Sequence, residues 1–371
     1  MTDRFPLSAD ELRLEHLDAL LHTVHPEVSV TGFTVTESHM PGDGNGAVST
    51  AGRISANVEY RGDGADELPT QLVIKVTRPD LPAVPLYRNE VAFYERLRPE
   101  LGSEIESPRC VGATFDEPSG TFGLALEDLT VRGATFPSVM TPVSIPQIRS
   151  IIDSVAILHA RFWDSPRFDS DLSWVQTHVA GELHDLFNRP GPVPAGVERQ
   201  IETQQFKREL VEMVGQTSES LYLQTRRAQA HQATLPRTQV HGDLHIGNTY
   251  LLPGDRGGFV DWQLTVRGYC MHDIAYLLVT GLSVEQRRAH ERDLLEYFRN
   301  RLGEAGVADV PDFATLWLEY RRAAVWGVYI GWLTVPVGYY DWEICVTNHI
   351  RLLTAYNDLE TADALADLPD A

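Results

Sequence analysis

The sequence predicts an α+β fold of two lobes, a small and mainly antiparallel β-rich lobe over residues 1–127 and a larger α-helical lobe over residues 128–371. Two observations predict it. Strand-like alternation and glycine-rich turns fill the chain as far as about residue 127. Helical periodicity dominates after that point.

The first lobe opens with a helix expected over residues 9–25, where leucines recur on one stripe. A strand containing Val30 and Val35, a glycine-rich turn and a second strand over 54–60 follow. The run Gln-Leu-Val-Ile-Lys-Val at 71–76 predicts a third strand. A helix over 87–97 and a strand over 122–126 complete the lobe.

The second lobe begins with an amphipathic helix expected over 143–163, then a proline-bearing stretch over 165–197 that predicts loops. Helices over 198–232, a strand–loop–hairpin unit over 238–262 and further helices over 271–366 follow. The uncharged stretch 323–340 has nearly the length of a membrane span. Its glycines and Pro336 favour instead a buried helix that ends near Leu333 and continues as a loop.

The charge balance excludes one class of partner. The chain has 52 acidic and 31 basic side chains and a net charge of −21. Nucleic acids and anionic membranes require clustered Lys and Arg, so neither is expected as a partner. Three widely spaced cysteines and an acidic N-terminus predict neither a disulfide framework nor a signal peptide, so a cytoplasmic location is expected.

The segment 240–263 carries the strongest chemical signal. Asp243 and Asn248 lie five residues apart in a short loop ahead of a strand, and Asp261 closes the hairpin that follows. Carboxylate and amide oxygens are ligands that Mg²⁺ prefers, and one carboxylate remains to accept a proton from a hydroxyl. This set predicts phosphoryl transfer. The alternative is a capped turn and an unrelated aspartate at a strand end.

These residues also carry a family resemblance. His-Gly-Asp-Leu-His-Ile-Gly-Asn at 241–248, Asp-Trp-Gln at 261–263 and His-Asp-Ile-Ala-Tyr at 272–276 resemble the motifs of the aminoglycoside phosphotransferase and choline kinase-like superfamily, the small-molecule relatives of protein kinases. Within it, the chain looks closest to the ecdysteroid-kinase-like branch and its bacterial relatives. The resemblance implies a two-lobed protein-kinase-like fold, with a nucleotide-binding first lobe and a catalytic, substrate-binding second lobe.

The resemblance also implies roles for individual residues. Asp243 would be the catalytic base, Asn248 and Asp261 would hold Mg²⁺, and Asp273 would be structural. ATP would be the phosphate donor.

The first lobe supplies a matching pair. Lys75 lies in the middle of a strand, where a charge is costly unless it is paired, and Glu90 follows fifteen residues later on the next helix. A strand lysine paired to a helix glutamate orders the nucleotide phosphates in kinases. A lysine that faces water is the alternative, and Glu95 competes as the partner.

Two further contacts to the nucleotide are expected. Backbone N–H groups of the glycine-rich turn, with Gly44, Gly46 and Ser49, would touch phosphate. The backbone from Leu126 to Asp128 would bond the adenine edge, as the interlobe linker does in the family. An ordinary turn and an ordinary strand end are the alternatives.

The acceptor pocket is expected in the second lobe, within an aromatic segment that includes Arg321, Trp326, Tyr329 and Trp332. Such a wall suits a sterol- or terpenoid-like alcohol or a cationic head group, unless these side chains are helix-packing core. The acidic charge favours cationic acceptors such as aminoglycosides or choline.

The predicted function is therefore transfer of the γ-phosphate of ATP, with Mg²⁺, to a hydroxyl of a small molecule. The alternatives are a nucleotide-binding pseudokinase or scaffold, and a transport-type or hydrolytic protein built around the aromatic segment. The oligomeric state is not readable from the sequence.

Overall fold

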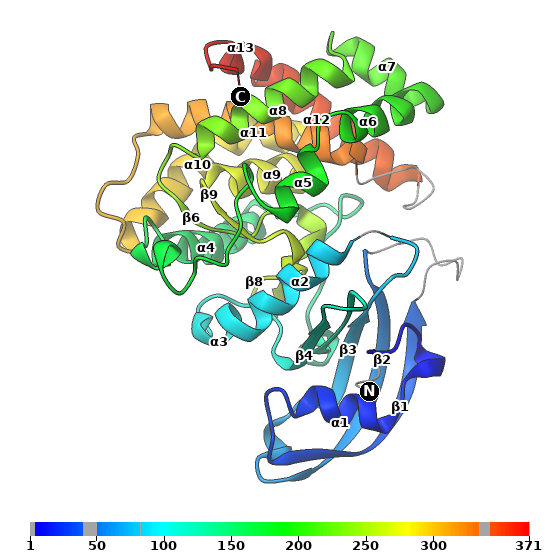
Figure 1. The fold of residues 1–371 in the computed structure, drawn as a ribbon. Coiled ribbons are helices and arrows are strands. Elements are labelled where there is room, and N and C mark those ends of the chain that lie inside the picture. Colours follow the sequence, from blue (N-terminus) through cyan, green and yellow to red (C-terminus); the bar gives the residue numbers. More distant parts are fainter. Residues whose placement is uncertain (1–3, 40–49, 82, 334–341, 371) are drawn as a thin grey trace. The chain divides into compact units, whose positions relative to one another are not determined.

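The computed structural model of the chain describes residues 4–39, 50–81, 83–333 and 342–370 (Figure 1). The chain divides into two compact units. The first comprises Met1–Thr135 with Val260–Gln263, and the second Phe136–Phe259 with Leu264–Ala371. The first unit holds a β-sheet and the second is mostly helical, which confirms the predicted α+β fold. The first unit extends past residue 127 and takes in a short segment from much later in the chain.

A five-stranded antiparallel sheet forms the first unit, in the order β1-β2-β3-β5-β4. Its strands are β1 (Val28–His39), β2 (Gly52–Gly62), β3 (Gln71–Val76), β4 (Cys110–Asp116) and β5 (Thr121–Glu127). Four of them lie where the sequence predicts strands. The fifth, β4, was not predicted, because it shows no clean alternation of buried and exposed residues.

One face of the sheet packs against α1 (Leu14–Leu21). Leu17 and Leu20 of this helix join Ile54 and Ile74 of the strands in one buried hydrophobic core. At Gly112 of β4, an added Cβ would lie 2.2 Å from the carbonyl oxygen of Leu20. Only glycine permits this close approach, so the position fixes how near α1 lies to the sheet.

The second helical stretch of this unit contains α2 (Val84–Ala92), a π-helical turn (Phe93–Leu97) and α3 (Arg98–Leu101). The helix predicted over 87–97 is therefore confirmed and begins three residues earlier. A proline stands in the first turn of α2, where its missing N–H costs nothing. The Tyr87 ring of α2 stacks on Phe122 of β5 with 4.3 Å between centroids, which fixes the helix against the sheet.

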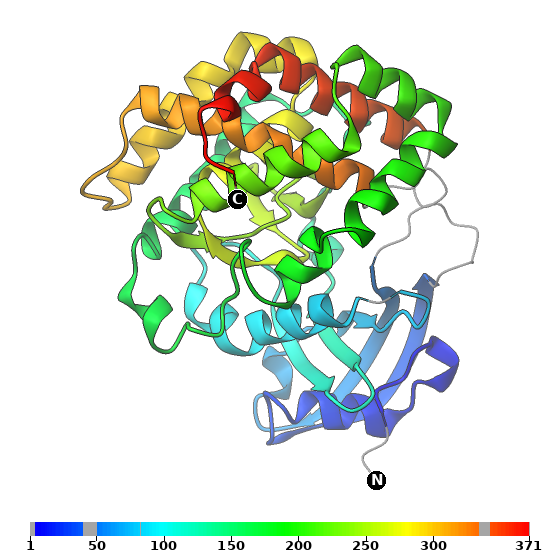
Figure 2. The same ribbon diagram turned by 45° about the horizontal axis from the view of Figure 1, so that its top comes forward.

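The second unit is built from ten helices in the described ranges. They are α4 (Ile145–Arg161), α5 (Glu182–Asn188), α6 (Pro192–Thr203), α7 (Gln205–Met213), α8 (Ser218–Gln232), α9 (Met271–Gly281), α10 (Val284–Glu304), α11 (Phe313–Leu333), α12 (Trp342–Asp358) and α13 (Thr361–Ala366). Helix α11 contacts α8, α9 and α12, and the red helix α13 lies beside the green α8 in both views (Figures 1 and 2).

Of two predictions for this unit, one is confirmed and the other is wrong in part. Helix α11 ends at Leu333 as predicted, and the loop expected after it lies outside the described residues. The loop predicted over 165–197 was wrong in part, because α5 and the start of α6 occupy it. Pro192 stands in the first turn of α6, where proline is compatible with a helix. None of the helices in the described ranges combines the length and apolar character that a membrane span requires.

Two short antiparallel ladders complete the second unit. Strand β6 (Thr238–Val240) pairs with β9 (Val266–Gly268), and β7 (Thr249–Leu252) pairs with β8 (Arg256–Phe259). The β7–β8 hairpin packs on α4. Ser154 of α4 donates a hydrogen bond to the Gly257 carbonyl oxygen at 2.9 Å, and a Cβ at Gly257 would lie 2.8 Å from the Cα of Ile151. The predicted strand–loop–hairpin unit is confirmed.

Burial in the second unit keeps His159, His272 and His349 neutral. Burial lowers the pKa of His159 to about 3, and that of His272 and His349 to about 4. Each pKa is therefore lower in the folded than in the unfolded chain. The stability that these histidines contribute is complete above about pH 6.5, the usual histidine value, and is lost as the pH falls.

We predict that replacing His159 by leucine flattens this acid dependence. Both ring nitrogens of His159 lack a hydrogen-bond partner among the described residues, although Nε2 lies 3.6 Å from Asp273 Oδ2, so the change removes a titrating group without breaking a hydrogen bond. The free energy of unfolding, measured by urea denaturation between pH 6.5 and 4.5, should lose about 1.4 kcal/mol per pH unit less than in the wild type. His290→Leu, at a half-buried position on α10, is the control. An unchanged slope in H159L would contradict the assignment.

Candidate active site

Strand alternation turns Lys75 away from the main core. Leu72, Ile74 and Val76 of β3 belong to the core that α1 covers. Because successive side chains of a strand point to opposite faces, Lys75 lies on the other face of the sheet. It is only 5 % exposed there, so its ammonium group needs partners within the protein.

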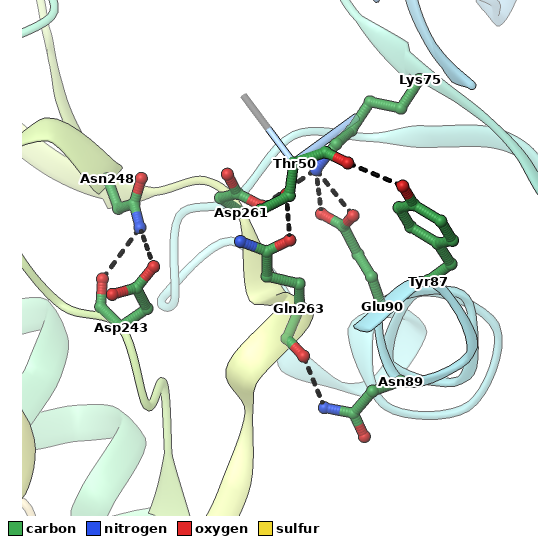
Figure 3. A network of polar contacts seen from close by, with 9 residues as sticks. All are labelled: Thr50, Lys75, Tyr87, Asn89, Glu90, Asp243, Asn248, Asp261 and Gln263. Carbon is green, nitrogen blue, oxygen red and sulfur yellow. Dashed lines mark hydrogen bonds and ion pairs between the residues drawn. The ribbon is translucent and has the colours of Figure 1, made fainter. Parts of the chain in front are cut away.

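Glu90 of α2 supplies the first partner. The Lys75 Nζ donates to Glu90 Oε1 at 2.7 Å and to Oε2 at 2.6 Å, and Glu90 is 1 % exposed (Figure 3). The competitor considered from the sequence, Glu95, is exposed on the π-helical turn. The structure thus brings together the strand lysine and the helix glutamate that the spacing predicted.

Asp261 supplies the second partner. The Lys75 Nζ lies 2.9 Å from Asp261 Oδ1, although 186 residues separate the two in sequence (Figure 3). We call Lys75, Glu90 and Asp261 the Lys75 cluster. The backbone of Asp261 is left-handed, with φ 66°, a conformation that costs a residue with a Cβ roughly 1–2 kcal/mol. Strain of this kind persists only where surrounding contacts hold it.

The neighbours of Asp261 provide those contacts. Trp262 stacks on Phe93 with 4.0 Å between ring centroids and donates its indole N–H to Ser107 Oγ at 3.0 Å. Gln263 accepts from Asn89 Nδ2 through its main-chain carbonyl at 3.0 Å and from Thr50 Oγ1 through its side chain at 2.5 Å (Figure 3). The sequence reasoning missed Asn89 and Thr50. The position of Asn89 directly before Glu90 was the one available signal for it.

Burial and neighbouring charges act in opposite directions on the ionisable groups of the Lys75 cluster. Burial alone would lower the pKa of Lys75, but Asp261 and Glu90 outweigh it and raise the pKa, so the ammonium stays charged. Burial raises the pKa of Glu90 to about 7 against the attraction of Lys75. Arg53 also attracts the Glu90 carboxylate. The two carboxylates together hold the buried ammonium group in place.

The second unit contains the other predicted pair. Asn248 Nδ2 donates to the main-chain oxygen of Asp243 at 2.9 Å and to its Oδ2 at 3.0 Å (Figure 3). This contact orients the half-buried Asp243 carboxylate. Since the amide nitrogen of Asn248 faces Asp243, its oxygen Oδ1 points away from that residue (Figure 3).

Asp273 of α9 fixes the loop that carries this pair. Its carboxylate accepts from the backbone N–H groups of His241 at 2.7 Å and Gly242 at 3.0 Å. Burial raises the pKa of Asp273 to about 7, although these two N–H groups act in the opposite direction. Gly242 has φ 85°, and a Cβ there would lie 1.9 Å from the Leu264 carbonyl oxygen, so no other residue fits.

Each unit carries one oxygen donor of the predicted metal-binding pair. Asn248 offers an amide oxygen and Asp261 a carboxylate, both oxygen ligands of the type that Mg²⁺ takes from proteins while water and phosphate fill its remaining positions. Among the described residues, no three His, Cys, Asp or Glu side chains gather as a metal site, so a zinc centre made wholly by the protein is not found in them.

The structure describes only some of the other residues that were predicted to contact the nucleotide. Gly44, Gly46 and Ser49 lie outside the described residues. Leu126 is buried in β5, opposite Val73 of β3. The backbone N–H of Glu127 donates to Arg109 and that of Asp128 to Gln71, at 3.0 and 2.9 Å. These two N–H groups are thus used within the protein, and the Asp128 carbonyl oxygen accepts from the Val131 N–H at 3.2 Å, so the adenine contact of this linker stays a prediction.

The aromatic segment packs mainly within the second unit. Arg321 donates to the Leu359 carbonyl oxygen at 2.6 Å and to Glu360 Oε2 at 3.0 Å. Tyr329 is fully buried and donates to the Phe187 carbonyl oxygen at 3.3 Å. The side chain of Trp332 is outside the described part. Trp326 is 5 % exposed and lines, with Gly242, a narrow space of about 10 Å³, so its contact with an acceptor stays a prediction.

Solved structures with a similar fold come from small-molecule kinases. An ethanolamine kinase from Plasmodium vivax is 12% identical, with a TM-score of 0.50 over 97% of this chain and 94% of that one. A spectinomycin phosphotransferase, APH(9)-Ia, is 12% identical, with a TM-score of 0.48 over 96% and 100%. A choline kinase from Streptococcus pneumoniae is 13% identical, with a TM-score of 0.43 over 93% and 98%. Of these three, the fold comparison rests on the first.

The curated proteins contain no match to the chain. The sequence model described as the phosphotransferase enzyme family, APH, matches residues 50–309. That range includes the Lys75 cluster and the Asp243–Asn248 pair, and it covers well over half of the 371 residues. The chain therefore belongs to the phosphotransferase enzyme family.

Proposed function

We propose that the chain transfers the γ-phosphate of ATP to a hydroxyl group of a small molecule. The observation that carries this proposal is the buried ion pair of Lys75 with Glu90 and Asp261. Burying an ammonium group against two carboxylates is expensive and is weak evidence for stability alone. In a member of the phosphotransferase enzyme family, an ammonium group held in this way is suited to phosphate oxygens.

The roles follow from the chemistry of each group. Lys75 contacts the α- and β-phosphates, and Glu90 positions Lys75. Asp243 accepts the proton of the attacking hydroxyl, and its hydrogen bonds with Asn248 hold it in one orientation. Gly44, Gly46 and Ser49 would contact phosphate, and the backbone at Leu126 and Asp128 the adenine edge.

Asn248 and Asp261 would hold Mg²⁺. When bound, the ion would neutralise negative charge on the phosphate oxygens. The Asp261 carboxylate beside Lys75 supports this assignment, because carboxylate oxygens are ligands that Mg²⁺ prefers. Aminoglycosides, choline-like compounds and sterol- or terpenoid-like alcohols are the acceptor classes that the sequence suggests.

We predict that Asp243→Asn abolishes transfer and spares nucleotide binding. ADP release, followed with a panel of aminoglycosides, choline and sterols, should fall by about 10²–10⁴-fold, the usual contribution of a general base. The rise in melting temperature produced by Mg·ATP should remain, because the Lys75 cluster is intact.

Two results would count against this assignment. Undiminished ADP release in D243N would exclude Asp243 as the base. Stabilisation by Mg·ATP in the wild type without turnover of any acceptor would favour the pseudokinase or scaffold alternative.

We also predict that Glu90→Gln weakens catalysis through Lys75. The amide keeps the size of the side chain but loses the charge that holds the ammonium group, so kcat/KM for ATP should fall at least about tenfold. Glu95→Gln is the matched control, because Glu95 is an exposed glutamate of the same helical stretch. It should stay within about twofold of the wild type. Equal effects of the two changes would remove the positioning role from Glu90.

A further inference from the structure

A cavity of about 200 Å³ lies in the second unit beside β9. Its walls come from the segment 177–179, the C-terminal part of α8, and Arg237, Arg267 and Gly268. No carboxylate is among the residues that line it. The chain has a net charge of −21, whereas the residues that line this cavity include two arginines and no acid. The lining is therefore positively charged.

The two arginines differ in how their charge is used. Arg237 makes a two-pronged ion pair with Asp169 and lies over the Phe168 ring, 5.7 Å from its centroid. Arg267 donates to the Phe168 carbonyl oxygen at 2.6 Å, and it forms no ion pair with a carboxylate in the described part of the chain. The hydrogen bond from Arg237 and the nearby charge of Arg267 both lower the pKa of Asp169, and Asp164 also attracts Arg237. Arg267 is therefore the guanidinium group of the two that makes no direct ion pair in the described part of the chain.

Gln229 of α8 gives an independent indication of a ligand. It lines the cavity and is only 4 % exposed, yet neither its amide nitrogen nor its amide oxygen has a hydrogen-bond partner within the described residues. Leaving such a group unsatisfied costs about 1–3 kcal/mol. The amide therefore offers a donor and an acceptor to a molecule in the cavity.

The remaining polar wall carries no charge. Burial lowers the pKa of His178 well below its usual value, so its ring is neutral at neutral pH. The attraction for a ligand then comes from the Arg267 guanidinium, whose planar fork matches a carboxylate. The volume corresponds to about seven waters, at about 30 Å³ each.

We propose that this cavity is a binding site for a small organic carboxylate of about seven non-hydrogen atoms. Arg267 binds the carboxylate, and Gln229 donates to one of its oxygens and accepts from a hydroxyl or amine of the ligand. The site goes beyond the proposed phosphate transfer, because binding requires neither ATP nor Asp243.

The ligand can come from two sources. The His178 ring stacks on His272 at 4.2 Å, and His272 Nε2 lies 3.0 Å from the carbonyl oxygen of Gly242, the residue before Asp243. The cavity is thus linked by direct contacts to the loop of the proposed base. A carboxylate bound there is either the acid group of a hydroxylated acceptor or a second ligand that is not phosphorylated.

Calorimetric titration of the whole chain with butyrate tests the binding, and butyramide is the neutral counterpart of the same size. We expect butyrate to bind and butyramide to bind at least about tenfold more weakly. Arg267→Gln should weaken butyrate at least about tenfold, whereas Arg199→Gln, which removes an exposed arginine of α6, should leave its affinity within about twofold.

Gln229→Met is a second variant that tests the site even if R267Q folds poorly. The thioether has nearly the same shape, and the amide that it replaces makes no hydrogen bond in the described structure. The melting temperature without ligand should therefore hold or rise, while butyrate binds more weakly. Absence of butyrate binding to the wild type, or equal affinity in the wild type, R267Q and Q229M, overturns the proposal.

4-Hydroxybutyrate separates the two sources. ADP release with this compound, with a raised KM and nearly unchanged kcat in R267Q, assigns the site to the acceptor. Binding without ADP release assigns it to a second ligand, and both results uphold the carboxylate site. Asp243→Asn should bind butyrate like the wild type, so failure of phosphate transfer and failure of this site are distinguishable.

Discussion

The ammonium group of Lys75 can be buried only because two carboxylates come to it from different parts of the chain. Glu90 arrives on α2 and Asp261 on a segment that follows a hairpin of the second unit. Burial of this charge therefore requires β3, α2 and the segment 260–263 to lie close together. It explains why Asp261 keeps a left-handed backbone and why residues 260–263 belong to the first unit by their contacts.

In the second unit, a buried carboxylate holds a loop through backbone hydrogen bonds. Asp273 accepts two backbone N–H groups and so shapes the 241–248 loop without a side-chain cation at hydrogen-bond distance. Asp243, two residues beyond His241, is left to be oriented by Asn248. Asp273, the structural carboxylate, is fully buried and accepts from two backbone N–H groups. Asp243, the carboxylate proposed for proton transfer, is half-buried and accepts a hydrogen bond from the Asn248 amide.

The sequence predicted the parts whose signal is local. Lys75 in an apolar strand and Glu90 on the next helix suffice for the pair, because burial forces a mid-strand charge to find a partner. Strand β4 was not predicted, because its position depends on packing against α1. The start of α6 was not predicted, because a proline in its first turn resembles a loop signal in the sequence. Contacts such as Asn89 with Gln263, or the joint presence of Arg267 and Gln229 at one cavity, depend on tertiary folding and leave no periodic trace.

The membership of residues 260–263 in the first unit also has a consequence for synthesis of the chain. A ribosome releases the five strands of the sheet long before Trp262, whose ring covers Phe93. Until then the first unit lacks both this stacking partner and the second carboxylate for Lys75. Its folding can be completed only after most of the second unit up to β8 has been made. The two units are therefore coupled in time by the order of the chain, and a contiguous fragment ending at Thr135 would carry an unfinished core.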